Sequence, residues 1–139
     1  MSALVRLAPR LLLGFSALCL SSGASVHALA YQKAAGIAEH STLPAFFVAA
    51  FKGLWLSDSL TCSGLALTIG AIAVFPRMAS RSLVMLLAVM PLASAMVILA
   101  TMGKFFAGYV MLLSSVTTLV GGALHRSGSR HAVESSDSA

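Results

Sequence analysis

The uninterrupted apolar run from Leu83 to Ala100 constrains this chain more than any other feature. It reads LVMLLAVMPLASAMVILA, with no charge and only one strongly polar side chain, Ser94. Runs of eighteen or more apolar residues are typical of transmembrane helices, because a segment of this kind would expose a large apolar surface in water. We therefore expect the chain to lie in a lipid bilayer.

The composition agrees with a membrane protein. Of the 139 residues, 58% are hydrophobic and 9% are charged, whereas soluble domains contain about 25% charged residues. The net charge of +5 does not indicate nucleic-acid binding, because the basic residues stand at the ends of apolar runs and form no basic face with interleaved aromatic residues.

Four apolar runs predict an all-α fold, an integral membrane four-helix bundle. The expected spans are residues 11–30, 56–75, 83–101 and 105–124, each about the 20 residues that a bilayer requires. Residues 1–124 then form one domain. Residues 125–139, polar and rich in serine, are expected to form a disordered cytoplasmic tail. In the third span, Pro91 predicts a kink, because it lacks an amide proton and crowds the carbonyl of Leu87.

The first run has two interpretations. Residues 11–30 are long enough for a retained helix. Alternatively, Arg6 and Arg10 belong to a signal peptide whose apolar core is 11–20 and whose cleavage site is Ala28-Leu29-Ala30, which would leave three helices. We favour retention, because three more spans follow and a helix here completes a four-helix bundle.

A polar segment, residues 31–42, is expected to form an outer loop before a short apolar stretch at 43–56. Ser41 or Thr42 is expected to cap a helix with Pro44 in its first turn. This helix either lies flat at the membrane interface or extends the second span outward. Three aromatic residues four positions apart share one helical face, which is predicted to be an apolar interface: Phe47, Phe51 and Trp55.

The basic residues predict the orientation. All six arginines fall on one side of the predicted membrane, and the three lysines fall on the other: Arg6, Arg10, Arg77, Arg81, Arg126 and Arg130 against Lys33, Lys52 and Lys104. Because positive residues favour the cytoplasmic side, both termini are expected in the cytoplasm, with the protein in the cell inner membrane.

One polar constellation is a candidate ligand or proton site. At a helical rise of 1.5 Å per residue, His27, Asp58 and Tyr109 come to about 23 to 25 Å from the cytoplasmic ends of their helices, with Lys104 just above them. Asp58 is the only acid within the predicted spans, and an unpaired carboxylate at membrane depth is costly. The structural alternative is that Asp58 caps a helix starting near Ser59, or pairs with Lys52 or Lys104.

Rows of small residues predict close helix packing. Ala66 and Gly70 are four apart, as are Ser114, Thr118 and Gly122, and such rows let helix backbones approach closely. Packing inside the bundle is the simpler interpretation, and docking against a membrane-protein partner or a second copy is the alternative.

No cofactor or metal site is predicted. His27 is the only histidine within the spans, so haem ligation by two histidines is not expected, and the two cysteines have no ligand partner at metal-binding spacing. Hydrolase, kinase and dinucleotide-binding motifs are absent from the sequence, so we do not expect an enzyme.

In its hydropathy, its length and the expected loop after the first helix, the chain resembles the small four-helix bacterial membrane proteins called DoxX-like. The resemblance implies architecture only. The leading functional hypothesis is an accessory or structural subunit, or a bundle that binds a small ligand or lipid. The alternatives are a small proton-coupled transporter using Asp58 and His27, and a redox or quinone-linked membrane subunit.

Overall fold

The structure, a computed structural model, describes the backbone of residues 3–125 and the side chains of residues 7–125. Every regular element in this range is helical. Four helical segments are long and apolar enough to cross a membrane: Leu7–Glu39, Ala45–Val74, Arg81–Met102 and Phe106–Leu124. The predicted all-α membrane bundle of four helices is therefore confirmed, although its first two helices are longer than expected.

Helix α1 (Ala3–Glu39) continues nine residues past its predicted end at Ala30. Residues 31–39, expected to belong to an outer loop, stay helical because they are rich in alanine and other good helix formers. Only residues 40–44 connect α1 to the next helix. The long outer loop predicted from the polarity of this segment is therefore wrong.

Helix α2 (Ala45–Val74) is a single helix, so residues 43–56 extend the second span and do not form a separate interfacial helix. Its N-cap is Pro44, with no side-chain cap. Ser41 instead serves the end of α1: its hydroxyl donates to the carbonyl of Ala38 (2.6 Å) and accepts from the amide of Leu43 (3.3 Å). The expected cap by Ser41 or Thr42 is therefore wrong.

The third span is divided in two. A short 3-10 helix, η1 (Pro76–Met78), leads to α3 (Arg81–Leu87), and α4 (Val89–Met102) follows after a turn at Ala88. The break confirms the predicted effect of Pro91, whose missing amide leaves the carbonyl of Leu87 without its helical donor. The neighbouring carbonyl of Ala88 accepts a hydrogen bond from Ser115 (2.9 Å), which joins the break to α5 (Phe106–Leu124).

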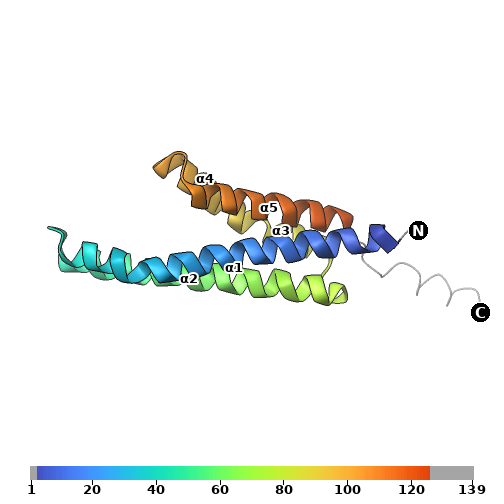
Figure 1. Cartoon of the computed structure of the whole chain (residues 1–139), viewed down its shortest axis with the longest axis horizontal. Helices are drawn as coiled ribbons and strands as arrows, with labels where there is room; N and C mark the ends of the chain where they lie inside the picture. The colour runs from blue at the N-terminus through green and yellow to red at the C-terminus, as the bar shows by residue number, and fades with distance from the viewer. Residues whose placement is uncertain (1–2, 126–139) are drawn as a thin grey trace, which may run out of the picture.

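The helices form two hairpins with α1 and α5 at the centre. Helix α1 packs against α2 and α5, and α5 packs against α1, α3 and α4, while α2 meets the second hairpin mainly through α3. Figure 1 shows the start of α1, the end of α2 and the end of α5 gathered at one end of the molecule. We call this the proximal end, and the α1–α2 turn marks the distal end.

Small residues bring the central helices together at the proximal end. Ser114, Thr118 and Gly122 are all buried in the bundle, as is Ala66, and a Cβ on Gly70 would contact Ala17 of α1 at 3.6 Å. Both rows found in the sequence thus serve packing inside the bundle. Fully buried aliphatic side chains complete this core: Leu13, Leu20, Ile69 and Val84.

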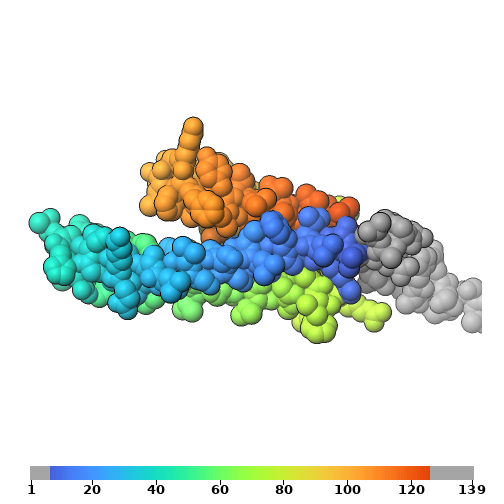
Figure 2. All heavy atoms as spheres, in the orientation of Figure 1, coloured from blue at the N-terminus to red at the C-terminus, as the bar shows by residue number. Residues whose placement is uncertain are grey.

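The two hairpins differ in length. At 1.5 Å per residue, the 33-residue apolar segment of α1 is about 50 Å long and α5, with 19 residues, is about 28 Å long. A hydrocarbon layer is about 30 Å thick, so α5 matches it and α1 exceeds it. Figures 1 and 2 show the α1–α2 hairpin continuing well past the α4–α5 turn.

One residue assigned to the tail belongs to the fold. His125 is buried, and its Nε2 lies 3.0 Å from the carbonyl oxygen of Ala79, which connects the end of α5 to the loop before α3. The rest of the predicted tail, 126–139, lies outside the described residues.

Candidate functional site

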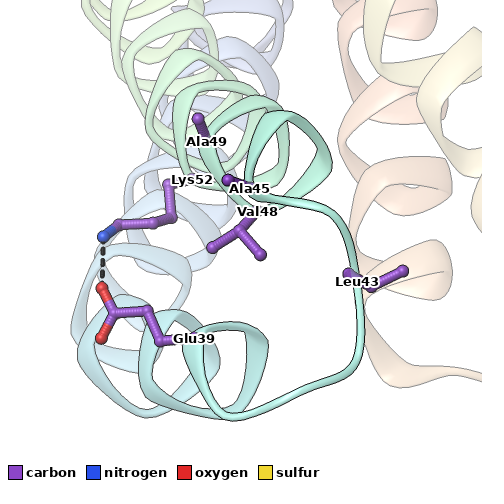
Figure 3. A pocket seen from close by; sticks show the side chains of 6 residues that line it. All are labelled: Glu39, Leu43, Ala45, Val48, Ala49 and Lys52. Atoms are coloured by element: carbon purple, nitrogen blue, oxygen red, sulfur yellow. Dashed lines mark hydrogen bonds and ion pairs between the residues drawn. The ribbon is translucent and has the colours of Figure 1, made fainter.

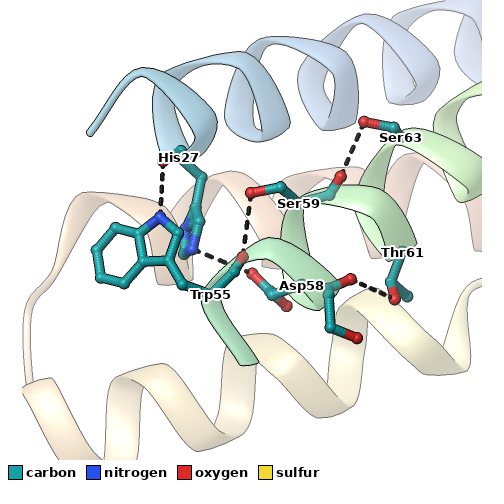
Figure 4. Close-up of polar contacts among 7 residues, drawn as sticks. His27, Trp55, Asp58, Ser59, Thr61 and Ser63 are labelled. Atoms are coloured by element: carbon teal, nitrogen blue, oxygen red, sulfur yellow. Dashed lines mark hydrogen bonds and ion pairs between the residues drawn. The ribbon is translucent and has the colours of Figure 1, made fainter. Parts of the chain in front are cut away.

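The structure brings His27 of α1 and Asp58 of α2 together. Their Nε2 and Oδ2 atoms are 3.8 Å apart, and the side chains are 31% and 51% exposed. Trp55 lies one turn before Asp58 on the same face of α2, as a spacing of three residues requires. Its indole ring lies against the imidazole, with ring centroids 4.2 Å apart, and its Nε1–H donates to the carbonyl of His27 at 2.8 Å (Figure 4).

The His27–Asp58 contact is an ion-pair distance and not a hydrogen bond, because N–H···O bonds fall between about 2.7 and 3.2 Å. His27 Nε2 is buried and has no hydrogen-bond partner among the described residues. The nearby hydroxyls are satisfied within α2: Ser59 donates to the carbonyl of Trp55 (3.2 Å) and Ser63 to that of Ser59 (2.8 Å). The carboxylate of Asp58 is therefore the polar group at this position that remains open to solvent or ligand.

The other two predicted site residues stay apart from this pair. Tyr109 lies in the first turn of α5 and is 48% exposed, and Lys104 lies in the turn before α5. Within residues 7–125, no hydrogen bond or ion pair joins either side chain to His27 or Asp58. Equal depth along the helices does not guarantee contact, because the helices also have to face each other.

The helix cap and the lysine pairs, two of the structural alternatives for Asp58, are not seen in the described residues. Asp58 lies in the middle of α2, so it does not cap a helix. Lys52 pairs with Glu39 instead, at 2.5 Å, and Lys104 makes no contact with Asp58 in the described part of the chain. Glu39 and Lys52 border a shallow groove of about 560 Å³ near the distal turn (Figure 3), lined by Glu39, Leu43, Ala45, Val48, Ala49 and Lys52.

The three aromatic residues predicted as one interface divide between two environments. The ring centroids of Phe51 and Trp55 are 5.3 Å apart. Trp55 is partly buried against α1. Phe47 is exposed and contacts Phe46 at 5.5 Å, edge to face. The sequence analysis missed Phe46, which is 75% exposed. Its signal was its position two residues after Pro44, in the first turn of the helix.

A second surface that the sequence analysis missed is the outer face of α2. Its members are small, exposed and spaced by three or four residues: Gly53, Ser57, Thr61, Gly64 and Thr68. We call these five residues the small-residue face. A Cβ on Gly53 or Gly64 would meet nothing within 4 Å, and all five residues are exposed in the described chain. The periodic spacing was visible in the sequence, but its direction relative to the bundle was not.

Within the described residues, no group of three or more histidine, cysteine or acidic side chains is placed to hold a metal ion. Cys62 is buried in α2, and Cys19 is partly buried in α1. Both cysteines therefore serve as small packing residues in their helices.

Comparison of the chain with protein-family models, curated proteins and solved structures finds no match. The resemblance to DoxX-like proteins receives no support from these comparisons. One of its grounds, a long outer loop after the first helix, is replaced by helix as far as Glu39.

Proposed function

We propose that this multi-pass membrane protein is a non-enzymatic accessory subunit that binds another membrane helix through the small-residue face of α2. One observation carries the proposal. The buried residues of α2 lie on one side of the helix, and the other side presents two glycines, a serine and two threonines that are all exposed, with open space around both glycines.

The physical reason lies in how helices associate in lipid. Lipid tails solvate leucine as well as a protein does, so the hydrophobic effect does not drive helix pairing. Small residues do favour pairing, because two backbones approach closely and gain van der Waals contact. The hydroxyls of Thr61 and Thr68 already donate to the carbonyls of Ser57 and Gly64, at 2.8 Å each, so neither threonine requires a hydrogen bond from a partner helix.

The same proposal includes the orientation and the retained first helix. Three arginines lie at the proximal end: Arg10, Arg77 and Arg81. They support an orientation in which this end faces the cytoplasm and the helices cross the inner membrane. Helix α1 contacts both α2 and α5, so cleavage after Ala30 would remove the helix that joins the two hairpins. Retention of residues 1–30 is therefore the expected state.

The test is crosslinking in native membranes. A photoreactive residue at Leu60 or Leu67, both exposed and flanking the small-residue face, is expected to crosslink to one product of defined mass. Adding Gly64→Leu is expected to lower the yield about ten-fold, the equivalent of about 1.4 kcal/mol of association. The mass of the product shows whether the partner is a second copy or another protein.

Gly14→Leu is the matched control, because Gly14 also lies in a membrane helix with nothing within 4 Å of its Cβ. It is expected to leave the yield unchanged. An equal yield from wild type and Gly64→Leu, or no crosslink from either position, would exclude this docking face.

A small proton-coupled transporter is the second candidate, because the structure brings His27 and Asp58 within 3.8 Å. The accessory function is better supported. Asp58 is half exposed on α2, and α2 meets the second hairpin mainly near the proximal end. A carrier is expected to hold its acid between helices that alternate in access. A redox or quinone-linked subunit has no specific observation in its favour.

A further inference from the structure

We propose that Asp58, with Trp55 and Phe51 beside it, binds the ammonium group of a zwitterionic phospholipid headgroup in the distal leaflet. The proposed site lies at the α1–α2 contact, and lipid binding there does not require the docking function proposed for the small-residue face. The ligand is a lipid headgroup because the site combines a carboxylate, aromatic rings and a position at the membrane boundary.

The depth of the site matches the headgroup boundary. Asp58 lies sixteen residues before Val74, the proximal end of α2, which places it about 24 Å along the helix. Trp55 comes to about 28 Å and Phe51 to about 34 Å by the same count. With a hydrocarbon layer of about 30 Å, these three residues straddle its distal boundary, where tryptophan is enriched.

Within the described chain Asp58 pairs with no lysine or arginine, and its one ion-pair contact is His27 Nε2 at 3.8 Å, which is beyond hydrogen-bond distance. Glu39 and Asp58 are the two acids within residues 7–125. Glu39 is neutralised by Lys52, but no lysine or arginine is recorded in an ion pair with Asp58. A carboxylate near the hydrocarbon boundary is costly without a partner. Because the Asp58 side chain is 51% exposed, an ammonium group on a neighbouring lipid can approach the carboxylate from the side away from His27.

The aromatic residues are arranged for this kind of ligand. Ammonium groups bind over aromatic faces within about 6 Å of the ring centroid, and tryptophan is the strongest binder. The Trp55 ring is held in place before any ligand arrives, because its N–H donates to the His27 carbonyl and its ring lies against the imidazole at a tilt of 35° (Figure 4). Phe51 extends the aromatic surface at 5.3 Å. A site fixed in advance loses less entropy on binding.

Native mass spectrometry of the purified full-length chain in mild detergent tests the proposal. Dioleoyl phosphatidylethanolamine and dioleoyl phosphatidylglycerol are added separately at equal concentrations. The wild type is expected to retain the ethanolamine lipid about ten-fold more than the glycerol lipid, a preference equivalent to about 1.4 kcal/mol. Trp55 is the only tryptophan, so its emission is expected to shift with the ethanolamine lipid alone.

Variants assign the preference to Asp58. Asp58→Asn keeps the shape of the side chain and is expected to abolish the preference, whereas Asp58→Glu keeps the charge and is expected to retain it. Glu39→Gln is the matched control, because it removes the other acid of the described helices, and it is expected to bind like wild type. Equal retention of both lipids by wild type, or an unchanged preference in Asp58→Asn, would overturn the proposal. If Asp58→Asn does not fold, the wild-type preference and the Trp55 emission still decide it.

Discussion

The proximal and distal halves of the α1–α2 hairpin are held in different ways. In the proximal half, α1 lies between α2 and α5, and the Ser16 hydroxyl lies 2.7 Å from that of Ser114 and 2.6 Å from that of Thr118. In the distal half, α1 extends past the α4–α5 turn with α2 beside it (Figure 1). There the two helices are joined by the Trp55–His27 hydrogen bond and the Glu39–Lys52 pair.

The difference indicates how the molecule divides stability and recognition. Close backbone contact and buried hydroxyls leave little freedom in the proximal half, whereas the distal half buries smaller side chains, Ala35 and Ala38, and its polar links remain partly exposed. Regions with few buried contacts open at lower free energy than the core. The groups that we assign to lipid binding lie where the hairpin leaves the bundle, so they can adjust without disturbing the proximal core.

Gly122→Leu is expected to have the largest effect, because it acts where the proximal half has no space. A Cβ at this position would lie 3.0 Å from Val84 Cγ1 and 3.3 Å from the backbone nitrogen of Met85. We expect a loss of about 3 kcal/mol in unfolding free energy, measured as the fraction of monodisperse protein after heating. Gly14→Leu, with open space around its Cβ, is expected to behave like wild type. Similar losses in both variants would remove the distinction between the two sites.

Ser16→Ala is expected to have a moderate effect. It removes the hydroxyl that links α1 to α5, although Thr118 keeps its own bond to the Ser114 carbonyl (2.8 Å). Hydrogen bonds between membrane helices contribute about 0.6 to 1.7 kcal/mol, so unfolding in mixed micelles should require less denaturing detergent. Ser25→Ala is the control, since Ser25 bonds only the Ser21 carbonyl of its own helix (2.8 Å). Equal midpoints for the two variants would contradict a structural role for Ser16.

The number and type of the helices were predictable, because apolar runs about 20 residues long have few other interpretations. The break near Pro91 was predictable for a similar reason, since the missing amide acts locally. The end of α1 was not: residues 31–39 are polar enough for a loop, yet the adjacent α2 extension and the Glu39–Lys52 pair support them as helix. The alanine-rich composition of the segment favours a helix, but the support from the partner helix cannot be seen in the segment itself.

For the candidate site, only the depth of each residue along its helix axis could be predicted. Helical rise placed His27, Asp58 and Tyr109 at one depth, but rotation about each axis decides which side chains meet. His27 and Asp58 face each other across adjacent helices, whereas Tyr109 belongs to α5 and is about half exposed. The small-residue face shows the same limit, because its spacing was present in the sequence while its outward direction depends on how α2 packs on α1.

Trp55→Phe is expected to have the smallest effect, confined to the distal half. It removes the donor to the His27 carbonyl and keeps an aromatic ring beside the imidazole. A hydrogen bond contributes about 1 kcal/mol, so hydrogen exchange in residues 28–39 should become about five-fold faster while the global unfolding midpoint stays the same. Hydrogen-exchange mass spectrometry measures residues 28–39 and the proximal residues 11–24 in one experiment.

Phe46→Leu is the matched control for this prediction, since Phe46 is an exposed aromatic of the same hairpin whose recorded ring contact is with Phe47 alone. It is expected to leave exchange in residues 28–39 unchanged. If Trp55→Phe also accelerates exchange in residues 11–24, the two halves unfold as one unit and the division between them is wrong. If exchange changes only beyond residue 27, the Trp55–His27 contact marks the point where the distal hairpin becomes independent of the bundle.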